Sequence, residues 1–387
     1  MVRRQEELLG ALKDPFEGGS FQEFIDNSFS GQNGLRTPGF AWAPFTQVGF
    51  TYEQIEAELG IKTMATYVDV NSPAPMKSVE GISLNSGKIP RFKQAYPVDE
   101  NIIRERMMLA SSMPGKVTAN MQNVILKQLF LSVEDLILGN YNTLTYQRDQ
   151  MVSKGALTLS DRDNPRGLQN ITFSAGVPEE NKTVLSGNYR WFTNDSGTEG
   201  STSDPVADLK KMVKTAKNKG MRAFHFEVEE TTFDKTLTHS KVAKWLGWGY
   251  SPVAPESNAI EIGRAMSSDA AKAMLERVIG APITINKEVV SVEKFDKTTK
   301  KVIKEQMPSF AENTWVLVPD GALGEIKAVI PILAGTPSNG DVAYYDGGRT
   351  MIKRMFNLDT NTMVVESECT ALVVPNKPKY MFYLTIQ

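Results

Sequence analysis

The chain has 387 residues, which is ample for a sizeable buried core and by length alone fits two or three domains. Its 43 basic and 45 acidic residues give a formal net charge of −2, which excludes a global attraction to nucleic acid or to an anionic membrane and would leave only a local basic patch. The single cysteine, Cys369, excludes an internal disulfide, and its apolar surroundings predict a buried, inert thiol in a strand.

The first fifty residues predict no secretory signal and no core of their own. The start "MVRRQEELLG" lacks an apolar segment, and no run in the chain approaches the roughly 20 apolar residues of a membrane span, so we expect a soluble, cytosolic protein. Residues 14–50 mix aromatic side chains with Gly, Ser, Asn and Pro without helical or strand period. Such a segment suits either an arm anchored in pockets of another surface or a stacking platform for single-stranded nucleic acid. Because Arg36 is the only basic residue in it, we prefer the arm.

The stretch "EGISLNSGKIP" superficially resembles a phosphate-binding loop. Five residues separate Gly81 from Gly87, where that loop requires four, and Ile89 follows Lys88 where Ser or Thr is required. The spacing and the missing hydroxyl therefore exclude a phosphate loop.

Residues 64–97 instead predict an extended two-stranded arm with legs at roughly Thr66–Val70 and Lys88–Gln94. With so few apolar residues such an arm is marginal alone in water, so we expect it to lie against a further surface, which need not belong to the same chain. Its basic residues Lys88, Arg91 and Lys93 would then meet acidic groups on a neighbour, or else form a solvated charge run.

Two helices are predicted next in the chain. Asp99–Ala110 predicts a short helix, and Thr118–Ser153 predicts one long helix that Gly155 ends. The long helix carries a narrow polar stripe between wide apolar flanks, so we expect it to be packed from two sides. At on the order of 54 Å it would cross the whole molecule, which favours a flattened protein built on a spine. The alternative is that Gly139 divides it into two shorter core helices.

The remainder of the chain predicts an α+β body. "SDPVADLKKMVKTAKNKG" is a well-specified helix, capped by Asp204, with Pro205 at its first position and Gly220 at its end. Further helices are expected near Asp234–Leu246 and at Ser268–Ile279. Strands are expected at "NITFSAG", "RAFHFEVE", "APITIN", "TWVLVP", "TMVVESECTALVVP" and "KYMFYLTI".

Catalytic motifs give no positive reason to propose an enzyme. The two histidines, His225 and His239, have no partner at metal-binding spacing and are interpreted as satisfied surface or edge residues. No Gly-x-Ser-x-Gly elbow occurs, and "GWGYSP" is interpreted as a helix-ending turn rather than a dinucleotide fingerprint. The acidic run at 227–234 could hold a divalent cation, but a solvated strand end is the preferred interpretation.

Five stretches carry a resemblance to a known family. They are "GKIPRFKQAYPVDENIIRERMML", the long helix followed by "GALTLSD", "DPVADLKKMVKTAKNKGMRAFHFEVEETTFDKTLTHSKVAKWLG", "NTWVLVPDGALG", and "MVVESECTALVVPNKPKYMFYLTIQ". In this order they resemble the tailed-phage major capsid proteins, specifically the lambda-like major capsid protein E branch, over nearly the whole chain. Each motif has few fixed letters, so the specificity comes from their order.

The resemblance implies an α+β capsid fold of the Hong Kong 97 type, with an N-terminal arm, an extended β-hairpin loop, a spine helix, and peripheral and axial domains. It implies a structural protein, without enzymatic activity, cofactor or metal, that assembles as hexamers and pentamers into the icosahedral head of a tailed bacteriophage around double-stranded DNA. The expected domains are an arm at 1–50, the loop and a flanking helix at 51–111, a peripheral domain at 112–200, an axial domain at 201–354 and returning C-terminal strands at 355–387.

The same resemblance implies contacts between subunits and further partners. A separate scaffolding protein and a portal are expected, a decoration protein is left open, and weak, non-specific contact to the packaged DNA, no membrane, and assembly in the host cytoplasm are expected. The alternatives are an encapsulin-like nanocompartment shell of the same fold and, more remotely, an uncharacterised α+β enzyme. The candidate intersubunit residues are Phe21, Phe24, Phe29, Trp42, Lys88, Arg91, Lys93, Arg104 and Arg106.

Overall fold

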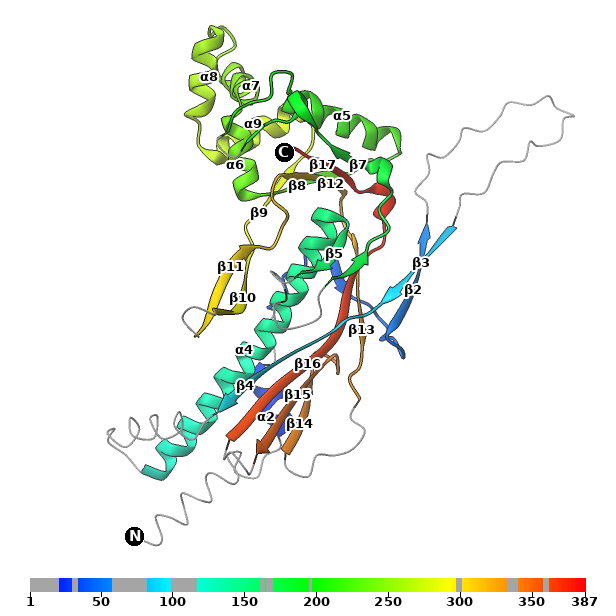
Figure 1. The fold of residues 1–387 in the computed structure, drawn as a ribbon, viewed down its shortest axis with the longest axis vertical. Helices are drawn as coiled ribbons and strands as arrows, with labels where there is room; N and C mark the ends of the chain where they lie inside the picture. The colour runs from blue at the N-terminus through cyan, green and yellow to red at the C-terminus, as the bar shows by residue number, and fades with distance from the viewer. Residues whose placement is uncertain are drawn as a thin grey trace, which may run out of the picture.

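The computed structural model describes residues 21–29, 34–57, 82–98, 117–160, 164, 170–194, 197–296, 301–332, 340–357 and 362–387. The predicted helix at Asp99–Ala110 and the predicted leg at Thr66–Val70 lie outside the described residues. Within the described part, helices and sheets form an elongated molecule with two hydrophobic cores, one at each end (Figure 1). None of the described helices is long and apolar enough to span a membrane.

The first core lies between the long helix α4 (Val117–Lys154) and a mixed sheet (Figure 1). Strand β16 is central, because it pairs antiparallel with β13, β15 and β4, while β1 pairs parallel with β13. The strands in this sheet are β1 (Phe40–Trp42), β13 (Gly324–Val329), β16 (Thr362–Pro375), β15 (Thr350–Asn357), β14 (Gly340–Tyr345) and β4 (Arg91–Val98).

The prediction of a single spine helix is confirmed. Helix α4 runs unbroken for 38 residues, about 57 Å, and Gly155 with φ +68° follows its last residue. Gly139 does not break it, and a Cβ at this position would lie 2.4 Å from the side-chain nitrogen of Gln94 on β4. Thr145 and Asp149 of the predicted polar stripe are buried, whereas Asn142 is exposed, so the polar side of the helix is covered only near its C-terminal end.

The second core lies between five helices and a sheet with the order β7-β17-β12-β8-β9 (Figure 1). Trp315 is its centre, with the rings of Trp191, Phe226 and Phe233 around it at 5.7 to 6.2 Å. The strands are β7 (Lys182–Val184), β17 (Phe382–Thr385), β12 (Thr314–Pro319), β8 (Phe224–Glu229) and β9 (Ile283–Asn286). The helices are α5 (Pro205–Asn218), α6 (Glu230–Thr238), α7 (Ser240–Tyr250), α8 (Glu256–Arg264) and α9 (Ser268–Ile279).

The helices of this end match the local sequence signals with one correction. In α5 the Asp204 carboxylate accepts from the Ala207 N–H, and α9 has the predicted bounds. The single helix predicted at Asp234–Leu246 is wrong: α6 and α7 are separate helices that meet at His239. Helix α8 was not predicted. It packs closely on α7, because a Cβ at Gly247 would lie 1.8 Å from a backbone oxygen of α8, which explains the glycine in "GWGYSP".

Three two-stranded sheets complete the described part of the chain: β2 (Thr51–Ala57) with β3 (Ile82–Lys88), β5 (Ala156–Leu159) with β6 (Ile171–Ser174), and β10 (Val289–Asp296) with β11 (Lys301–Pro308). The β2–β3 hairpin projects from the side of the body (Figure 1). The predicted leg Lys88–Gln94 needs correction, because β3 ends at Lys88 and β4 begins at Arg91 on β16. Pro90 separates the two strands since it has no N–H for a ladder.

The N-terminal segment contributes to the chain's own core, which corrects the expectation that its aromatic residues need another surface. Helix α2 (Phe21–Phe29) was not predicted, and it buries Phe21 and Ile25 in the first core together with Phe40 of β1. Its Gln22 side chain donates to the Tyr344 carbonyl at 2.8 Å and accepts from the Tyr344 N–H at 2.7 Å. The helix therefore satisfies part of the open edge of β14.

Candidate functional site

The base of the projecting hairpin forms an aromatic clamp that is attached to the body because Tyr52 and Ile89 are buried in the first core. Tyr52 is buried at the start of β2, and its ring covers Gly87 of β3 so closely that a Cβ there would lie 2.8 Å from the ring. Ile89, just beyond β3, is also buried and its N–H donates to the Phe50 carbonyl at 2.9 Å. The Arg91 guanidinium lies 5.1 Å from the centre of the Phe50 ring. The hairpin therefore has a fixed exit from the body.

A row of charges, called the β4 seam below, joins Arg91 and Lys93 of β4 to Glu366 and Glu368 of β16, the central strand of the first core. The Lys93 ammonium is 2.8 Å from a carboxylate oxygen of Glu368, and Arg91 and Lys353 reach the same carboxylate at 3.2 and 3.1 Å. Burial alone would raise the pKa of Glu368, but hydrogen bonds from Lys93 and Lys353 outweigh it and lower this pKa. The hydrogen bond to Glu368 raises the pKa of Lys93. The acidic partners of Arg91 and Lys93 in the described residues are thus on the same chain, with Glu366 beside them.

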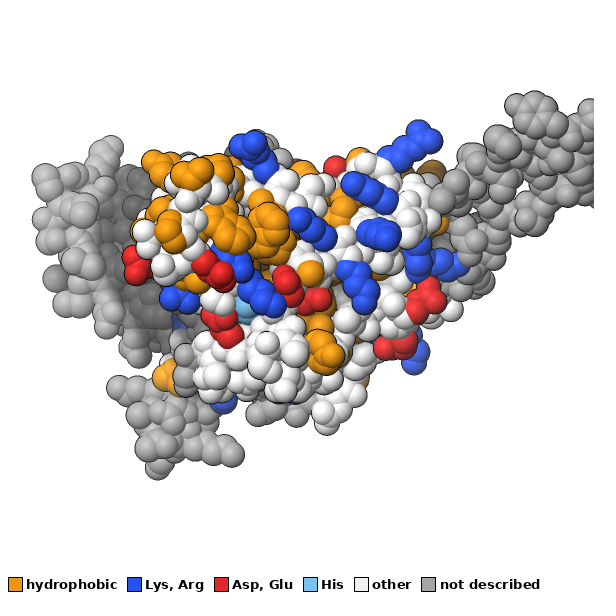
Figure 2. Space-filling view, turned by 90° about the horizontal axis from the view of Figure 1, so that it is seen from above, with side chains coloured by type: hydrophobic (Ala, Val, Ile, Leu, Met, Phe, Trp, Pro, Cys, Tyr) orange, Lys and Arg blue, Asp and Glu red, His pale blue; other side chains and the backbone are white. Residues whose placement is uncertain are grey.

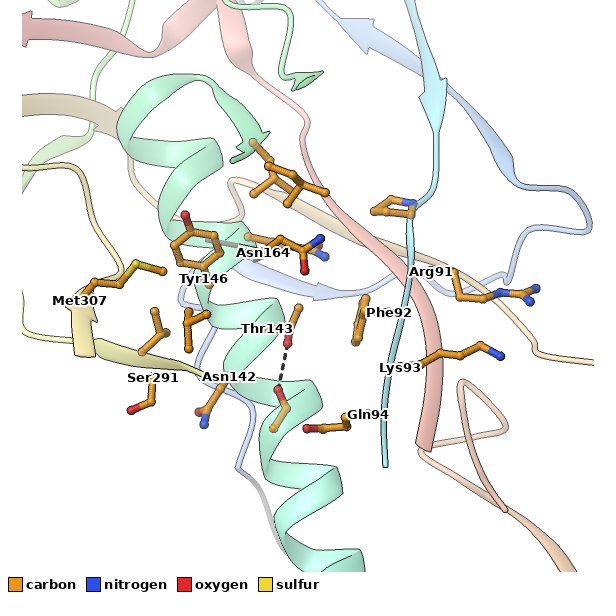
Figure 3. A pocket seen from close by; sticks show the side chains of 17 residues that line it. Arg91, Phe92, Lys93, Gln94, Asn142, Thr143, Tyr146, Asn164, Ser291 and Met307 are labelled. Atoms are coloured by element: carbon orange, nitrogen blue, oxygen red, sulfur yellow. Dashed lines mark hydrogen bonds between the residues drawn. The ribbon is translucent and has the colours of Figure 1, made fainter. Parts of the chain in front are cut away.

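The opposite side of β4 faces the spine helix. The Gln94 amide donates to the Leu136 carbonyl at 2.6 Å and to the Asn140 side-chain oxygen at 3.2 Å, in the space left by Gly139. Figure 3 shows Phe92 and Gln94 on the helix side of β4, and Arg91 and Lys93 on its other side. Between β4, α4 and the β10–β11 hairpin lies a pocket of about 580 Å³. Its lining is partly apolar, with Phe92 and Tyr146 among the residues.

A buried ion pair joins the two cores. Arg148 of α4 donates to both carboxylate oxygens of Glu227 on β8, at 2.7 and 2.6 Å, and to Asp149 at 2.9 Å. Burial would raise the pKa of Glu227, yet the adjacent Arg148 charge and hydrogen bonds lower it to about 2. The interpretation of the acidic run as a solvated strand end is therefore wrong for Glu227. It is also wrong for Glu229, whose buried carboxylate accepts from two N–H groups at the start of α6 at 2.8 Å.

The ion pair belongs to a wider polar network. Asp149 accepts from the Ser309 hydroxyl and, at 2.9 Å, from the Asn286 amide, and burial raises the pKa of Asp149 despite the Arg148 charge. His225 lies 3.4 Å from Glu227 and 2.5 Å from Asp320. Burial would lower the pKa of His225, but its hydrogen bonds to these carboxylates raise it. The network links α4, β8, β9 and the residue that follows β11, so it fixes the angle between the cores.

The described side chains show no arrangement for catalysis. The His239 ring lies 2.9 Å from the Ser203 hydroxyl, as in a nucleophile–base pair. Its other ring nitrogen accepts from the Lys241 N–H at 3.2 Å, so in the neutral ring the proton is on the nitrogen that faces Ser203. His239 is then a donor to Ser203, whose own proton goes to the Gly200 carbonyl at 2.7 Å. His239 is satisfied as predicted, although it is buried rather than at the surface.

Neither a reactive thiol nor a metal centre is found in the described part of the chain. Cys369 is buried in β16, as predicted, and burial raises its pKa to about 12, which supports the prediction of an inert thiol. No group of His, Cys, Asp or Glu among the described residues is placed to hold a metal ion.

The candidate intersubunit residues are distributed over three places. Phe21 is buried in the chain's own core, with Phe24 stacked beside it at 6.4 Å. Trp42 is half-buried under the Arg349 guanidinium, and Lys88 is exposed at the end of β3. Arg91 and Lys93 lie in the β4 seam. The side chain of Phe29 and the residues Arg104 and Arg106 are outside the described part, and the intersubunit role of the whole set remains a prediction.

Sequence reasoning missed the residues that organise this region: Glu366, Glu368, Arg148, Gln94 and Gly139. A signal was present for some of them. Glu366 and Glu368 stand in an otherwise apolar strand, "MVVESECTALVV", and a charge in such a context requires a partner. The identity of the partners is not encoded locally, because Arg148 and Glu227 are 79 positions apart.

One of the comparisons with known proteins identifies a family. The model of phage major capsid protein E matches residues 35–386. No curated protein matches the chain. A solved structure described as a capsid protein of an Escherichia coli prophage is 11% identical, with 95% of this chain and 99% of that chain covered and a TM-score of 0.48.

Two further solved structures show a similar extent of overlap. A phage-related protein from Bordetella bronchiseptica is 14% identical over 94% of this chain and 97% of that one, with a TM-score of 0.44. The capsid of cyanophage P-SCSP1u is 8% identical over 90% and 86% of the two chains, with a TM-score of 0.45. Because these TM-scores are below 0.5, the assignment rests on the family match.

Proposed function

The chain belongs to the phage major capsid protein E family and is a structural protein of a phage capsid, and we propose that it closes into hexamers and pentamers through its projecting hairpin. Family membership confirms the resemblance found in the sequence and favours a virion shell over an encapsulin-like nanocompartment. We also propose that the chain has no enzymatic role, because its described polar clusters join structural elements.

The observation that carries the proposal is the isolation of the β2–β3 sheet. Its two strands pair with each other along seven registered positions, from Thr51↔Lys88 to Ala57↔Ile82, and among the described strands neither pairs with a third. Two-stranded sheets are marginally stable at best in water. A hairpin held out from the body therefore gains stability when a second subunit covers it, and contacts of this head-to-tail kind close into rings.

The base of the hairpin supports the same function. The Tyr52 clamp fixes its direction, and the β4 seam connects the hairpin to β16 and, through Gln94, to the spine helix. A force applied to the hairpin by a neighbouring subunit would thus pass through β4 directly to β16 at the centre of the first core. This connection suits a shell subunit, in which each copy must resist displacement by its neighbours.

Shortening the hairpin tests the proposal. Residues 58–81 are replaced by Asn-Gly, which suits a two-residue turn between the paired ends Ala57 and Ile82. The variant should unfold at the wild-type urea midpoint, because the aromatic clamp and both cores are retained, but should form no shells by negative-stain microscopy. Shells at wild-type yield would contradict the intersubunit role. A lowered unfolding midpoint would show that the hairpin stabilises its own chain instead.

The further partners follow from the same function. We propose assembly in the host cytoplasm around a portal, with a separate scaffolding protein and a decoration protein, and we propose double-stranded DNA as the content of the shell. The division of the chain into an arm, loop, peripheral domain and axial domain, with the boundaries given above, remains a proposal as well. Two separate hydrophobic cores support a division into two bodies but not the boundary at 354, because β13, β14 and β15 belong to the sheet of the first core and β17 to the sheet of the second.

A further inference from the structure

Helix α5 carries a continuous basic face at the end of the molecule that holds the second core. It buries Val206, Leu209, Met212, Val213 and Ala216 against that core, and Lys210, Lys211, Lys214 and Lys217 are exposed on the remaining surface. The positions are three and four residues apart, so the side chains are neighbours on the helix. Figure 2, seen from above, shows a run of Lys and Arg side chains across this end.

The positive charge of this face is not compensated within the described part of the chain. No carboxylate there lies within ion-pair distance of Lys210, Lys211, Lys214 or Lys217. Of the two acidic residues at the start of α5, Asp204 caps the helix and lies 3.6 Å from Lys241. Asp208 accepts from the Trp191 indole N–H at 2.8 Å and feels the Lys211 charge without forming a direct ion pair with it. Lys210 rests on the half-exposed Trp245 ring, with its ammonium 4.9 Å from the ring centre.

Repulsion between the lysines of this face destabilises α5, and no direct ion pair in the described part of the chain offsets it. Like charges three or four residues apart on a helix repel one another, and the chain as a whole is slightly acidic. Lys217 has a structural reason to be basic, because it stands in the last turn of the helix, where a cation is favourable. Lys210, Lys211 and Lys214 are exposed and make no direct ion pair in the described part of the chain, so this face is open to an anionic partner.

We propose that the α5 face binds the phosphate backbone of double-stranded DNA. The lysines extend over about 10 Å of helix, and a linear array of cations suits a linear polyanion that carries one charge per about 1.7 Å of axis. The inference rests on the proposed function, which supplies the DNA, and names the surface that contacts it. Binding is independent of base sequence, because flexible ammonium groups contact phosphates and no described group of the face is placed to read base edges.

The test is a titration of a labelled duplex of ~20 base pairs with the full-length chain between about 50 and about 200 mM NaCl, followed by fluorescence anisotropy. Four phosphate contacts predict a slope of log affinity against log salt of about −3.6, which is about a 150-fold loss over this range. The variant K211Q/K214Q/K217Q should retain a slope of only about −0.9. The variant K211R/K214R/K217R keeps the charges and should keep the wild-type slope.

A comparison variant, K287Q/K294Q/K304Q, removes three cations from β10–β11 and the residues before it, of which Lys287 and Lys294 are paired with Glu230 and Glu305. It should bind DNA with the wild-type slope. An equal loss in the two glutamine variants would overturn the proposal, since the charge would then act without a defined site. Absence of DNA binding by the wild type at the lowest salt would also overturn it. The third contrary result is capture of labelled poly-glutamate, but not of DNA, through Lys211, Lys214 and Lys217, which would indicate an acidic protein segment as the partner.

Folding and assembly are scored separately. Replacing these lysines removes repulsion between like charges but also the favourable Lys217 charge in the last turn of α5, so the thermal unfolding midpoint should change little. A variant that binds no DNA and unfolds like the wild type supports a binding role. Failure of the wild-type chain to form shells would contradict the proposed function, whereas the salt slopes alone decide whether this face binds DNA.

Discussion

Substituting Glu227 with Gln should remove the charge that balances the buried Arg148 while keeping the size of the side chain. The lowered pKa of Glu227, about 2 against the ordinary 4.5, corresponds to about 3 kcal/mol of stabilisation by the ionised form. Breaking one partner of a buried pair costs about 3 to 5 kcal/mol in general. Because Asp149 still neighbours Arg148, we expect the lower end of this range, about 3 kcal/mol.

The assay is urea unfolding of the full-length chain, followed by the fluorescence of Trp191 and Trp315 in the second core. Since the folded-state pKa of Glu227 lies below the unfolded value, its contribution is fully present above pH 4.5 and is lost as the pH falls towards 2. The raised pKa of Asp149 acts in the opposite sense, because its ionisation disfavours the folded state. The free energy of unfolding of E227Q should therefore change less between pH 4.5 and about 2 than that of the wild type.

Two comparisons make this prediction refutable. The control E261Q neutralises an exposed glutamate on α8 that has no ion-pair partner in the described residues, and it should change stability by less than about 0.5 kcal/mol. The triple variant R148M/D149N/E227L should be more stable than E227Q, because the buried Arg148, Asp149 and Glu227 charges are then all removed and none is left unpaired. A loss below about 1 kcal/mol for E227Q, or acid profiles that coincide with the wild type, would show that the ion pair does not hold the cores together.

Two further predictions concern the first core. Gly139→Ala should lower the free energy of unfolding in urea, because losing the Gln94 amide hydrogen bonds costs more than the gain of about 1 kcal/mol in helix propensity. The double variant with Gln94→Ala should recover the loss. A single variant more stable than the wild type would contradict this. The Cys369 thiol should not react with a thiol reagent in the folded protein at pH 8, because it is buried and burial raises its pKa to about 12. It should react fully in denaturant. Rapid labelling of the folded chain would be the contrary result.

The sequence by itself determined helices α4, α5 and α9 and the family of this protein. Helix α5 was predicted with its cap, its proline and its buried face, because each of these signals lies within a few residues of the helix. The unbroken helix α4 was predicted from periodicity over many turns, since a long regular pattern outweighs one glycine. The family was recognised from the order of weak apolar motifs, and the match over residues 35–386 confirmed it.

The tertiary structure alone decided which distant segments meet. The sequence predicted an extended segment around Lys88–Gln94, but periodicity of two does not encode a partner, and the segment divides into a hairpin leg and a strand on β16. The acidic run was read as solvated because the cation that balances Glu227 lies on another element. Local propensities depend on neighbouring residues, whereas strand partners and buried charge pairs depend on where the whole chain places its two cores.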